Sequence, residues 1–282
     1  MTRNSLNFPI PFTKMTGTGN DFIIVDHRQP FLSTEDASAL ARLACRRRFS
    51  AGADGLILIE NSEAVNFKWQ FFNADGSQAE MCGNGARCAA RYAYTKSIAP
   101  AKMRFSTTAG IIEAEMVGEG VKIQLTRPEN LQINQTVMVR DNKLAVHSVN
   151  TGVPHAVVFT DDIRGAPVVE WGRAIRNHQL FAPAGTNVNF VQVTGPNRLN
   201  VRTYERGVED ETMACGTGAV ASAIIASLSA QVTSPTSVVT SGGEILIIHF
   251  SKDGEDTVTE VFLEGPAHFI YEGQMYKEAL LG

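Results

Sequence analysis

The sequence is 282 residues long, which exceeds the usual size of a single hydrophobic core and favours two domains. Apolar residues make up 44% and charged residues 19%, an ordinary balance for a soluble globular protein, and no apolar stretch is long enough to span a membrane. The formal net charge is -4, and the basic residues are scattered apart from Arg46, Arg47 and Arg48, which argues against a nucleic-acid partner.

The beginning of the chain and its cysteines favour a reducing compartment. The first residues, MTRNSLNFPIPF, lack an apolar core followed by a small-residue cleavage site, so we expect no secretory signal and a cytoplasmic location. Four cysteines, at positions 45, 82, 88 and 215, are too few and too irregular for the disulfide framework of a small secreted protein. Their spacing does not match that of zinc ligands, so we predict no metal site.

Each half of the chain predicts strands and two helices. In the first half, short apolar or alternating runs bounded by Gly, Asn and Asp predict strands over 22–25, 56–59, 67–72 and 110–125. Polar cap residues at 33–36 precede the helical run ASALARLACRRR, and an alanine-rich helix opens at Gly83. In the second half, strands are predicted over 156–159, 188–193, 199–204, 243–250 and 257–263.

The sequence repeats itself at an offset of 133 residues, the separation of Cys82 from Cys215. The segment MCGNGARCAARYA at 81–93 matches ACGTGAVASAIIA at 214–226. The same offset places Gly52-Ala53-Asp54 on Gly185-Thr186-Asn187, Thr107 and Gly110 on Thr240 and Gly243, and Gly19-Asn20 on Gly152-Val153. A shared register over most of the chain indicates two halves of one fold.

The repeat therefore predicts an α+β fold of two pseudo-symmetric domains. Each domain is expected to be a mostly antiparallel sheet around a central helix. The predicted ranges are 1–130, which carries Cys82, and 131–282, which carries Cys215, with allowance for a C-terminal strand that crosses over.

Both repeated cysteines stand where a predicted strand meets a helix, in the pattern Cys-Gly-x-Gly-Ala. A helix N-terminus has unpaired N–H groups and the positive end of the helix dipole, so it favours a thiolate and binds a carboxylate. The glycines allow the backbone to come close to a ligand. Each junction is thus a candidate thiolate and half of an anion site. Cys45 and Cys88 lie inside apolar helical stretches and are predicted to be buried core residues.

Two such thiols suit the racemisation of an amino acid without pyridoxal phosphate. The reaction needs a base on one face of the α-carbon and an acid on the other, and two like groups can exchange these roles. Two helix N-termini facing each other across a cleft would stabilise the negative charge that develops on the substrate carboxylate. We therefore predict a cofactor-independent amino-acid epimerase or racemase that uses Cys82 and Cys215.

The sequence resembles diaminopimelate epimerase over nearly its whole length. The motifs that carry the resemblance are MTGTGNDFIIVD at 15–26, FFNADGSQAEMCGNGARC at 71–88, GVPHAV at 152–157, TNVNFV at 186–191 and YERGVEDETMACGTGA at 204–219. The resemblance implies two domains of one fold, a site between them that closes on the substrate, and commonly a homodimer. The implied reaction interconverts LL- and meso-2,6-diaminopimelate, which are precursors of lysine and peptidoglycan.

The resemblance also implies roles for individual residues. Cys82 and Cys215 would be the exchanging base and acid. The positions that hold the reacting α-amino and α-carboxylate groups are matched by Asn20, Gly83, Asn84, Gly216 and Thr217. The positions that grip the distal amino and carboxylate groups are matched by Asn73, Asn187, Glu205 and Arg206. His155 and Glu205 match positions that tune the pKa values of the cysteines.

The distal residues make chemical sense independently of the resemblance, and two positions depart from the family pattern. An Arg suits a bidentate grip on a carboxylate, and an adjacent Glu can meet an ammonium group. Many members have Asn where this chain has Val153, and several have Gln where it has Gly55. Both differences remove hydrogen bonds to the substrate, which water can replace.

Three alternative functions would place different demands on the sequence. A two-thiol racemase of another amino acid, such as proline or hydroxyproline, would have no use for Glu205 and Arg206. A thiol–disulfide redox protein would need a resolving cysteine nearby, and no pair has CxxC spacing. A binding protein of the same fold would not need a thiol at both helix starts.

Overall fold

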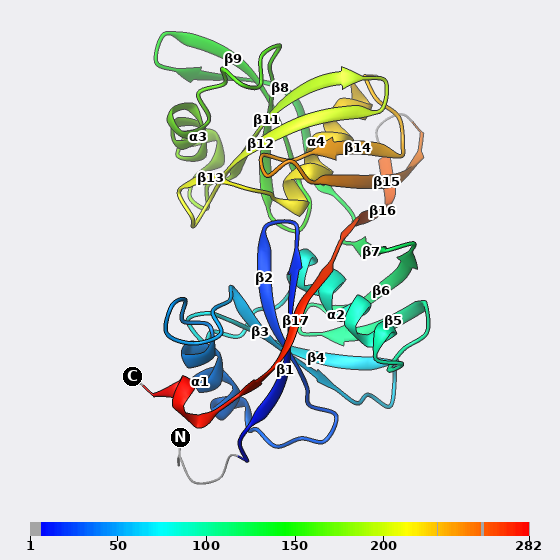
Figure 1. Cartoon of the computed structure of the whole chain (residues 1–282). Helices are drawn as coiled ribbons and strands as arrows, with labels where there is room; N and C mark the ends of the chain where they lie inside the picture. Colours follow the sequence, from blue (N-terminus) through cyan, green and yellow to red (C-terminus); the bar gives the residue numbers. More distant parts are fainter. Residues whose placement is uncertain (1–6, 230, 255–256, 282) are drawn as a thin grey trace. The chain divides into compact units, whose positions relative to one another are not determined.

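The computed structural model describes residues 7–229, 231–254 and 257–281. The chain divides into two compact units: residues up to Ile123 together with those from Pro266 onward form unit 1, and Gln124–Gly265 form unit 2 (Figure 1). In the part of the chain that the structure describes, no helix is both long and apolar enough to cross a bilayer.

Unit 1 is a curved sheet with a helix on each face. Its strands pair in the order β17, β1, β2, β3, β4, β5, β6, β7, and only the pairs β2–β3 and β4–β5 are parallel. The strands are β1 (Ile10–Gly17), β2 (Asn20–Asp26), β3 (Gly55–Glu60), β4 (Phe67–Asn73), β5 (Lys102–Thr107), β6 (Gly110–Val117), β7 (Gly120–Leu125) and β17 (His268–Met275). The helices are α1 (Thr34–Ala44), α2 (Gly83–Thr95) and the short η2 (Lys277–Leu280).

Unit 2 repeats this arrangement. Its strands pair in the order β8, β9, β10, β11, β12, β14, β15, β16, and only β10–β11 and β12–β14 are parallel. The strands are β8 (Glu129–Val139), β9 (Asn142–Asn150), β10 (Pro154–Phe159), β11 (Asn187–Gly195), β12 (Arg198–Glu205), β13 (Asp210–Thr212), β14 (Thr236–Val239), β15 (Ile245–Asp253) and β16 (Thr257–Pro266). The helices are α3 (Val168–Arg176), η1 (Gln179–Phe181) and α4 (Gly216–Leu228).

Apart from the short β13, which pairs with β12 in unit 2, the two sheets match strand for strand, in order and in the sense of each pairing, which confirms the predicted fold of two pseudo-symmetric α+β domains. Most of the predicted strands lie within observed ones, but the range 110–125 is divided into β6 and β7 by a turn at 118–119, and β15 begins at Ile245 rather than at position 243. The boundaries differ from 1–130 and 131–282, because unit 2 begins at Gln124 and β17 lies in unit 1. The C-terminal strand belongs there because it pairs with β1 from Ile10 to Thr16, the place that β8 takes beside β9.

The central helices α2 and α4 each carry one of the repeated cysteines at their N-cap. Ten of the thirteen residues of α4 are buried, and the helix contacts β9, β10, β11, β12 and β15. Helix α2 similarly contacts β1, β2, β3 and β6. A helix with such small, apolar residues on nearly every side is stable only when the sheet surrounds it. The rigid sheet thus fixes where each cysteine lies.

The second helix of each unit covers the opposite face of the sheet. Helix α1 packs on a core that includes Ile23, Val25 and Leu40, and α3 packs on a core that includes Val158 and Phe190. Because side chains alternate along a strand, their neighbours in sequence face the central helices instead. The Ser33 hydroxyl caps α1 by accepting from the Asp36 N–H at 3.1 Å, as predicted. The helix ends at Ala44, earlier than its sequence predicts.

Candidate active site

Cys82 is the N-cap residue of α2. Its backbone is extended, and its Sγ accepts a long hydrogen bond from the Gly85 N–H at 3.5 Å. Burial raises the pKa of this thiol, whereas the N–H groups of Gly85 and Asn84 and the charge of Arg87 act to lower it. The sulfur therefore has donors and a cation that favour its thiolate, set against the cost of desolvation.

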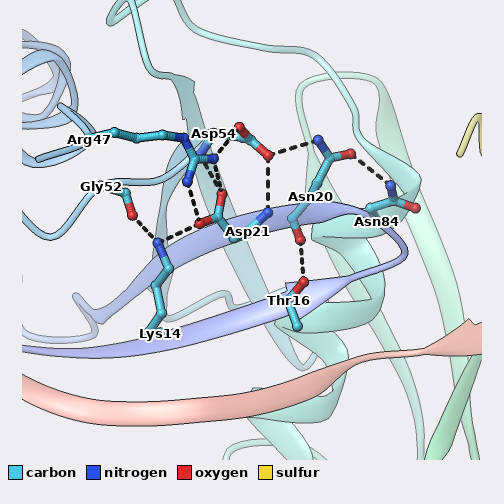
Figure 2. A network of polar contacts seen from close by, with 8 residues as sticks. All are labelled: Lys14, Thr16, Asn20, Asp21, Arg47, Gly52, Asp54 and Asn84. Carbon is cyan, nitrogen blue, oxygen red and sulfur yellow. Dashed lines mark hydrogen bonds and ion pairs between the residues drawn. The ribbon is translucent and has the colours of Figure 1, made fainter. Parts of the chain in front are cut away.

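A series of side-chain hydrogen bonds, in which each donor and acceptor is determined, leads to the start of α2 (Figure 2). The Asn84 Nδ2 donates to Asn20 Oδ1 at 2.8 Å, and Asn20 Nδ2 donates to Asp54 Oδ2 at 2.9 Å. Because the Asp54 carboxylate only accepts, the orientation of the Asn20 amide is determined, and that of Asn84 follows from it. Asn20 and Asn84 are therefore held ready before any ligand arrives.

The far end of this network contains two carboxylates and two cations (Figure 2). Arg47 contacts Asp21 at 2.6 Å and Asp54 at 2.8 Å, and Lys14 contacts Asp21 at 2.8 Å and the Gly52 carbonyl. Burial works against ionisation of Asp21, but hydrogen bonds from Arg47 and Lys14 outweigh it and hold its pKa below the usual range. Sequence analysis did not identify Asp54, although it lies in a repeated Gly-Ala-Asp segment.

Arg87, which sequence analysis also missed, is fully buried in α2. Its guanidinium donates to Thr18 Oγ1 at 2.6 Å, to Asn84 Oδ1 at 2.8 Å and to the Pro266 carbonyl at 3.3 Å. A buried charge of this kind needs its hydrogen bonds in full. The signal in the sequence is an Arg placed inside an otherwise alanine-rich helix.

Arg87→Met is expected to lower the free energy of unfolding by about 1–3 kcal/mol, because it leaves buried oxygens without donors. It should also slow alkylation of Cys82 by iodoacetamide at fixed pH, because a nearby positive charge is lost. Arg91→Met is the matched control. Arg91 lies one turn later and donates to the Glu119 carbonyl at 2.8 Å and to the Ala267 carbonyl. Equal slowing of Cys82 alkylation in both variants would contradict this role.

Cys215 is the N-cap residue of α4, as Cys82 is of α2. Its Sγ lies 3.5 Å from the Thr217 hydroxyl oxygen. Burial, followed by the negative charge of Glu205, raises the pKa of this thiol to about 11, and Thr217 acts to lower it. The electrostatic surroundings of the two junctions therefore differ: the charge of Arg87, which lowers the pKa of Cys82, outweighs that of Asp54, whereas the charge of Glu205 raises the pKa of Cys215.

His155 lies beneath the start of α4 and is fully buried. Its Nε2 is 2.9 Å from the Thr217 hydroxyl, and its Nδ1 is 3.1 Å from the side-chain nitrogen of Asn189. Burial, with the charge of Arg206, lowers the pKa of His155 to about 3. The imidazole is therefore neutral at physiological pH, and it contacts the Thr217 hydroxyl, which in turn lies beside the Cys215 sulfur.

The predicted distal residues lie in corresponding places in the two units. Glu205 is the last residue of β12 and Arg206 follows it, and the Arg206 backbone N–H donates to Asn187 Oδ1 at 2.8 Å. Asn73 takes the position in β4 that Glu205 has in β12, and it donates to Ser77 Oγ at 2.9 Å. Burial raises the pKa of Glu205. Each unit thus gathers its own share of the predicted residues: Cys82, Gly83, Asn84 and Asn20 in unit 1, and Cys215, Gly216, Thr217, His155 and Asn187 in unit 2.

The structure explains one of the two departures from the family pattern. A Cβ at Gly55 would lie 2.5 Å from the Phe71 ring and 2.7 Å from the Phe72 carbonyl oxygen, so no side chain fits there unless the strand and ring shift. Val153 lies half-buried between β9 and β10. Nothing in the structure explains why this position holds Val.

The last glycine of each Cys-Gly-x-Gly junction has a different neighbour in the two units. A Cβ at Gly218 would lie 2.3 Å from the Asn189 side-chain oxygen, whereas a Cβ at Gly85 would lie 3.3 Å from the end of Ile57.

Ala is favoured over Gly inside a helix by about 1 kcal/mol. Gly218→Ala should nevertheless destabilise the protein by about 1–3 kcal/mol through overpacking. Gly85→Ala, the matched control, should stay within about 1 kcal/mol of the parent in urea unfolding. Equal free energies of unfolding in the two variants would contradict the close contact of Gly218 with Asn189.

A sequence profile of the diaminopimelate epimerase family matches residues 12–130 and 147–270. The chain belongs to this family. It is 47% identical over 280 residues to the diaminopimelate epimerase of Aquifex aeolicus, covering 95% of this chain and 99% of that protein.

Solved structures of other members of the fold are more distant. A phenazine biosynthesis protein of the PhzF family from Bacillus anthracis has a TM-score of 0.72 at 15% identity and covers 94% of this chain and 98% of its own. A hydroxyproline epimerase from Agrobacterium vitis has a TM-score of 0.64 at 10% identity and covers 97% of this chain and 94% of its own. The fold by itself therefore does not select a substrate.

Proposed function

We propose that this protein epimerises LL-2,6-diaminopimelate to the meso form, and the reverse, by an acid–base mechanism with Cys82 and Cys215 and without a cofactor. The observation that carries the proposal is the repeated junction. Both thiols are N-cap residues of equivalent helices in two copies of one fold, within a chain 47% identical to a protein named for this reaction. The reaction supplies a precursor of lysine and peptidoglycan.

The chemistry requires one thiolate and one thiol on opposite faces of the same carbon. The thiolate removes the α-proton and becomes a thiol, while electrons from the broken C–H bond delocalise into the substrate carboxylate. The opposite thiol then donates its proton to the other face and becomes the thiolate. The product therefore has the inverted configuration, and the enzyme is ready for the reverse reaction.

The α-carboxylate gains negative charge during this step, and helix N-termini are suited to stabilise it. In this proposal Gly83 and Asn84 of α2, with Gly216 and Thr217 of α4, offer donors to the reacting end. Asn20 completes the set, since its amide is already oriented by Asp54 and Asn84. A preorganised donor stabilises the transition state without reorganisation during the reaction.

The distal end of the substrate carries an ammonium and a carboxylate that do not react. We assign the carboxylate to Arg206, and the ammonium to Glu205 together with the side-chain amides of Asn73 and Asn187. Asn187 also holds the Arg206 backbone at 2.8 Å, so the hairpin after β12 is anchored. This grip discriminates against proline and hydroxyproline, which have no second zwitterion.

We further propose a tuning role for His155 and Glu205, a cytoplasmic location and a homodimer. Glu205 disfavours ionisation of Cys215, whereas the Thr217 hydroxyl beside His155 favours it. Sedimentation of the purified chain tests the dimer: a monomer at micromolar concentration would contradict that part of the proposal.

The experiment that tests the function is α-proton exchange in deuterated water over several amino acids. LL-diaminopimelate should exchange and epimerise, whereas proline, hydroxyproline and short monoamino acids should exchange at least about a hundredfold more slowly, because they make no distal contacts. Comparable exchange with proline would favour the alternative of a two-thiol racemase of another amino acid. Exchange with none of them would overturn both proposals.

A further inference from the structure

Three buried positions beneath the central helix differ in chemical character between the two units. In unit 1 they form an apolar trio, and in unit 2 they form a polar trio. The strand registers place the members in correspondence: Phe22, Ile57 and Phe71 in unit 1 stand where His155, Asn189 and Thr203 stand in unit 2.

The apolar trio shows that the fold does not need polar groups at these positions. The rings of Phe22 and Phe71 meet edge to face at 5.9 Å, and Phe22 and Ile57 lie under Gly85 of α2. Buried polar groups cost free energy unless they are hydrogen-bonded, so replacing this trio by polar residues gives no evident gain in packing. The polar trio of unit 2 therefore calls for a role beyond supporting the helix.

The hydrogen bonds of Asn189 determine which way its amide points. The atom that faces the Ala156 carbonyl at 3.0 Å must be the nitrogen, because a carbonyl only accepts. The oxygen at the other end accepts from the Thr203 hydroxyl at 2.9 Å. Both ends of the amide are therefore held by partners, and the side chain cannot flip without losing them.

The orientation of Asn189 in turn determines the tautomer of His155. The same Asn189 nitrogen lies 3.1 Å from His155 Nδ1 and can only donate, so Nδ1 carries no proton. The proton of the neutral ring is then on Nε2, which donates to the Thr217 hydroxyl oxygen at 2.9 Å. Thr217 must direct its own hydrogen elsewhere, and the Cys215 sulfur lies 3.5 Å away.

We propose that Asn189, held by Thr203, is a positioning residue that fixes the Nε2–H tautomer of His155 and so commits the Thr217 hydroxyl to donate to the Cys215 sulfur. Its meaning for catalysis rests on the proposed function, but the proton positions and the thiol reactivity are properties of the protein without substrate. The opposite tautomer would turn the Thr217 hydroxyl toward the ring and leave the sulfur without this donor.

Two charged side chains near these hydrogen bonds affect the ionisation of Cys215 and His155. The negative charge of Glu205 opposes ionisation of Cys215, while the positive charge of Arg206 disfavours a proton on His155. A donor that is already directed at the sulfur stabilises the thiolate when Cys215 has to act as the base. In unit 1 the cation Arg87 favours the thiolate instead, and Phe22 and Ile57 of the apolar trio lie under Gly85.

The first test locates the protons by long-range ¹H–¹⁵N NMR of the full chain labelled with ¹⁵N-histidine. Signals of His155 are assigned by their loss in His155→Phe, which imitates Phe22 of unit 1. At pH 7 His155 should be neutral, with its proton on Nε2. A proton on Nδ1, or a doubly protonated ring, would overturn the proposal.

The second test measures alkylation of each cysteine by iodoacetamide, with the modified peptides quantified by mass spectrometry. Asn189→Leu should slow Cys215 alkylation at pH 8 about tenfold, the loss expected when a thiolate loses a hydrogen bond. Cys82 in the same sample is the internal control and should react at its original rate. An unchanged Cys215 rate in the folded variant would overturn the proposal.

A second pair of variants keeps the test decisive if Asn189→Leu does not fold. Thr217→Val removes the hydroxyl and should slow Cys215 alkylation by the same factor, whereas Thr217→Ser keeps it and should restore most of the rate. Equal rates of Cys215 alkylation in the Val and Ser variants would contradict the proposed hydrogen bond from the Thr217 hydroxyl to the sulfur. Neither test measures turnover. A failure of the proposed epimerase activity can therefore be distinguished from a failure of the proposed hydrogen bonds from Asn189 through His155 and Thr217 to Cys215.

Discussion

Replacing either Cys82 or Cys215 by Ala is expected to abolish epimerisation of diaminopimelate. One acid–base group contributes about 10²–10⁴-fold to the rate, so each variant should lose at least about a hundredfold in kcat. The remaining thiol can still remove and return a proton on its own face. Each variant should therefore exchange the α-proton of one substrate configuration only, and the two variants should prefer opposite configurations. Chiral separation of substrate and product in deuterated water measures both properties.

The control uses the same substitution at Cys88. This residue lies in α2, six positions after Cys82, and is fully buried as a core residue. Cys88→Ala should keep the activity and lose only a modest part of the free energy of unfolding, through the small cavity that it leaves. Full activity in Cys82→Ala or Cys215→Ala would contradict the two-base scheme, and so would the same configurational preference in both.

The second large effect is expected at the distal end of the substrate. Arg206→Met should lower kcat/KM for diaminopimelate about a hundredfold, because a charge-assisted hydrogen bond to a carboxylate is lost. Most of the loss should appear in KM, since the distal carboxylate is bound equally in the ground state and the transition state. Steady-state kinetics in both reaction directions measure how the loss is divided between kcat and KM.

Arg198→Met provides the control for Arg206. Arg198 is an exposed arginine at the start of β12, the strand that ends just before Arg206. The substitution removes the same charge from the same strand and should leave kcat/KM within about twofold, as surface charges contribute little. If Arg206→Met changed kcat/KM no more than Arg198→Met does, the assignment of the distal carboxylate to Arg206 would fail.

The repeat made the fold predictable from the sequence. Because Cys82 and Cys215 recur at one offset with the surrounding glycines, two copies of one unit followed, and the matching strand orders confirm them. A C-terminal strand that crosses over was allowed for, but the partner of β17 could not be predicted in this way. Its pairing with β1 joins the two ends of the chain, and a local pattern of apolar residues does not specify a partner so far away in sequence.

The parts of the site that the sequence did not predict are the ones that depend on contacts in three dimensions. Arg87 and Asp54 look like ordinary charged residues in the sequence, and only the structure shows that Arg87 donates to Asn84 and that Asp54 accepts from Asn20. Asn189 carried a weak signal, because it lies two residues after Asn187 on a strand and therefore faces the same side. Its bonds to His155 and Thr203 depend on strand register, which the sequence did not specify.

If two thiols act on one carbon from opposite faces, deuterium from the solvent should enter the product and not the recovered substrate. LL-diaminopimelate is incubated with the enzyme in deuterated water, and both isomers are analysed by mass spectrometry at early times. The two-thiol mechanism predicts one deuterium in each newly formed meso molecule and none in the remaining LL substrate. Deuterium entering the LL substrate as fast as the meso product forms, or meso product without deuterium, would contradict it.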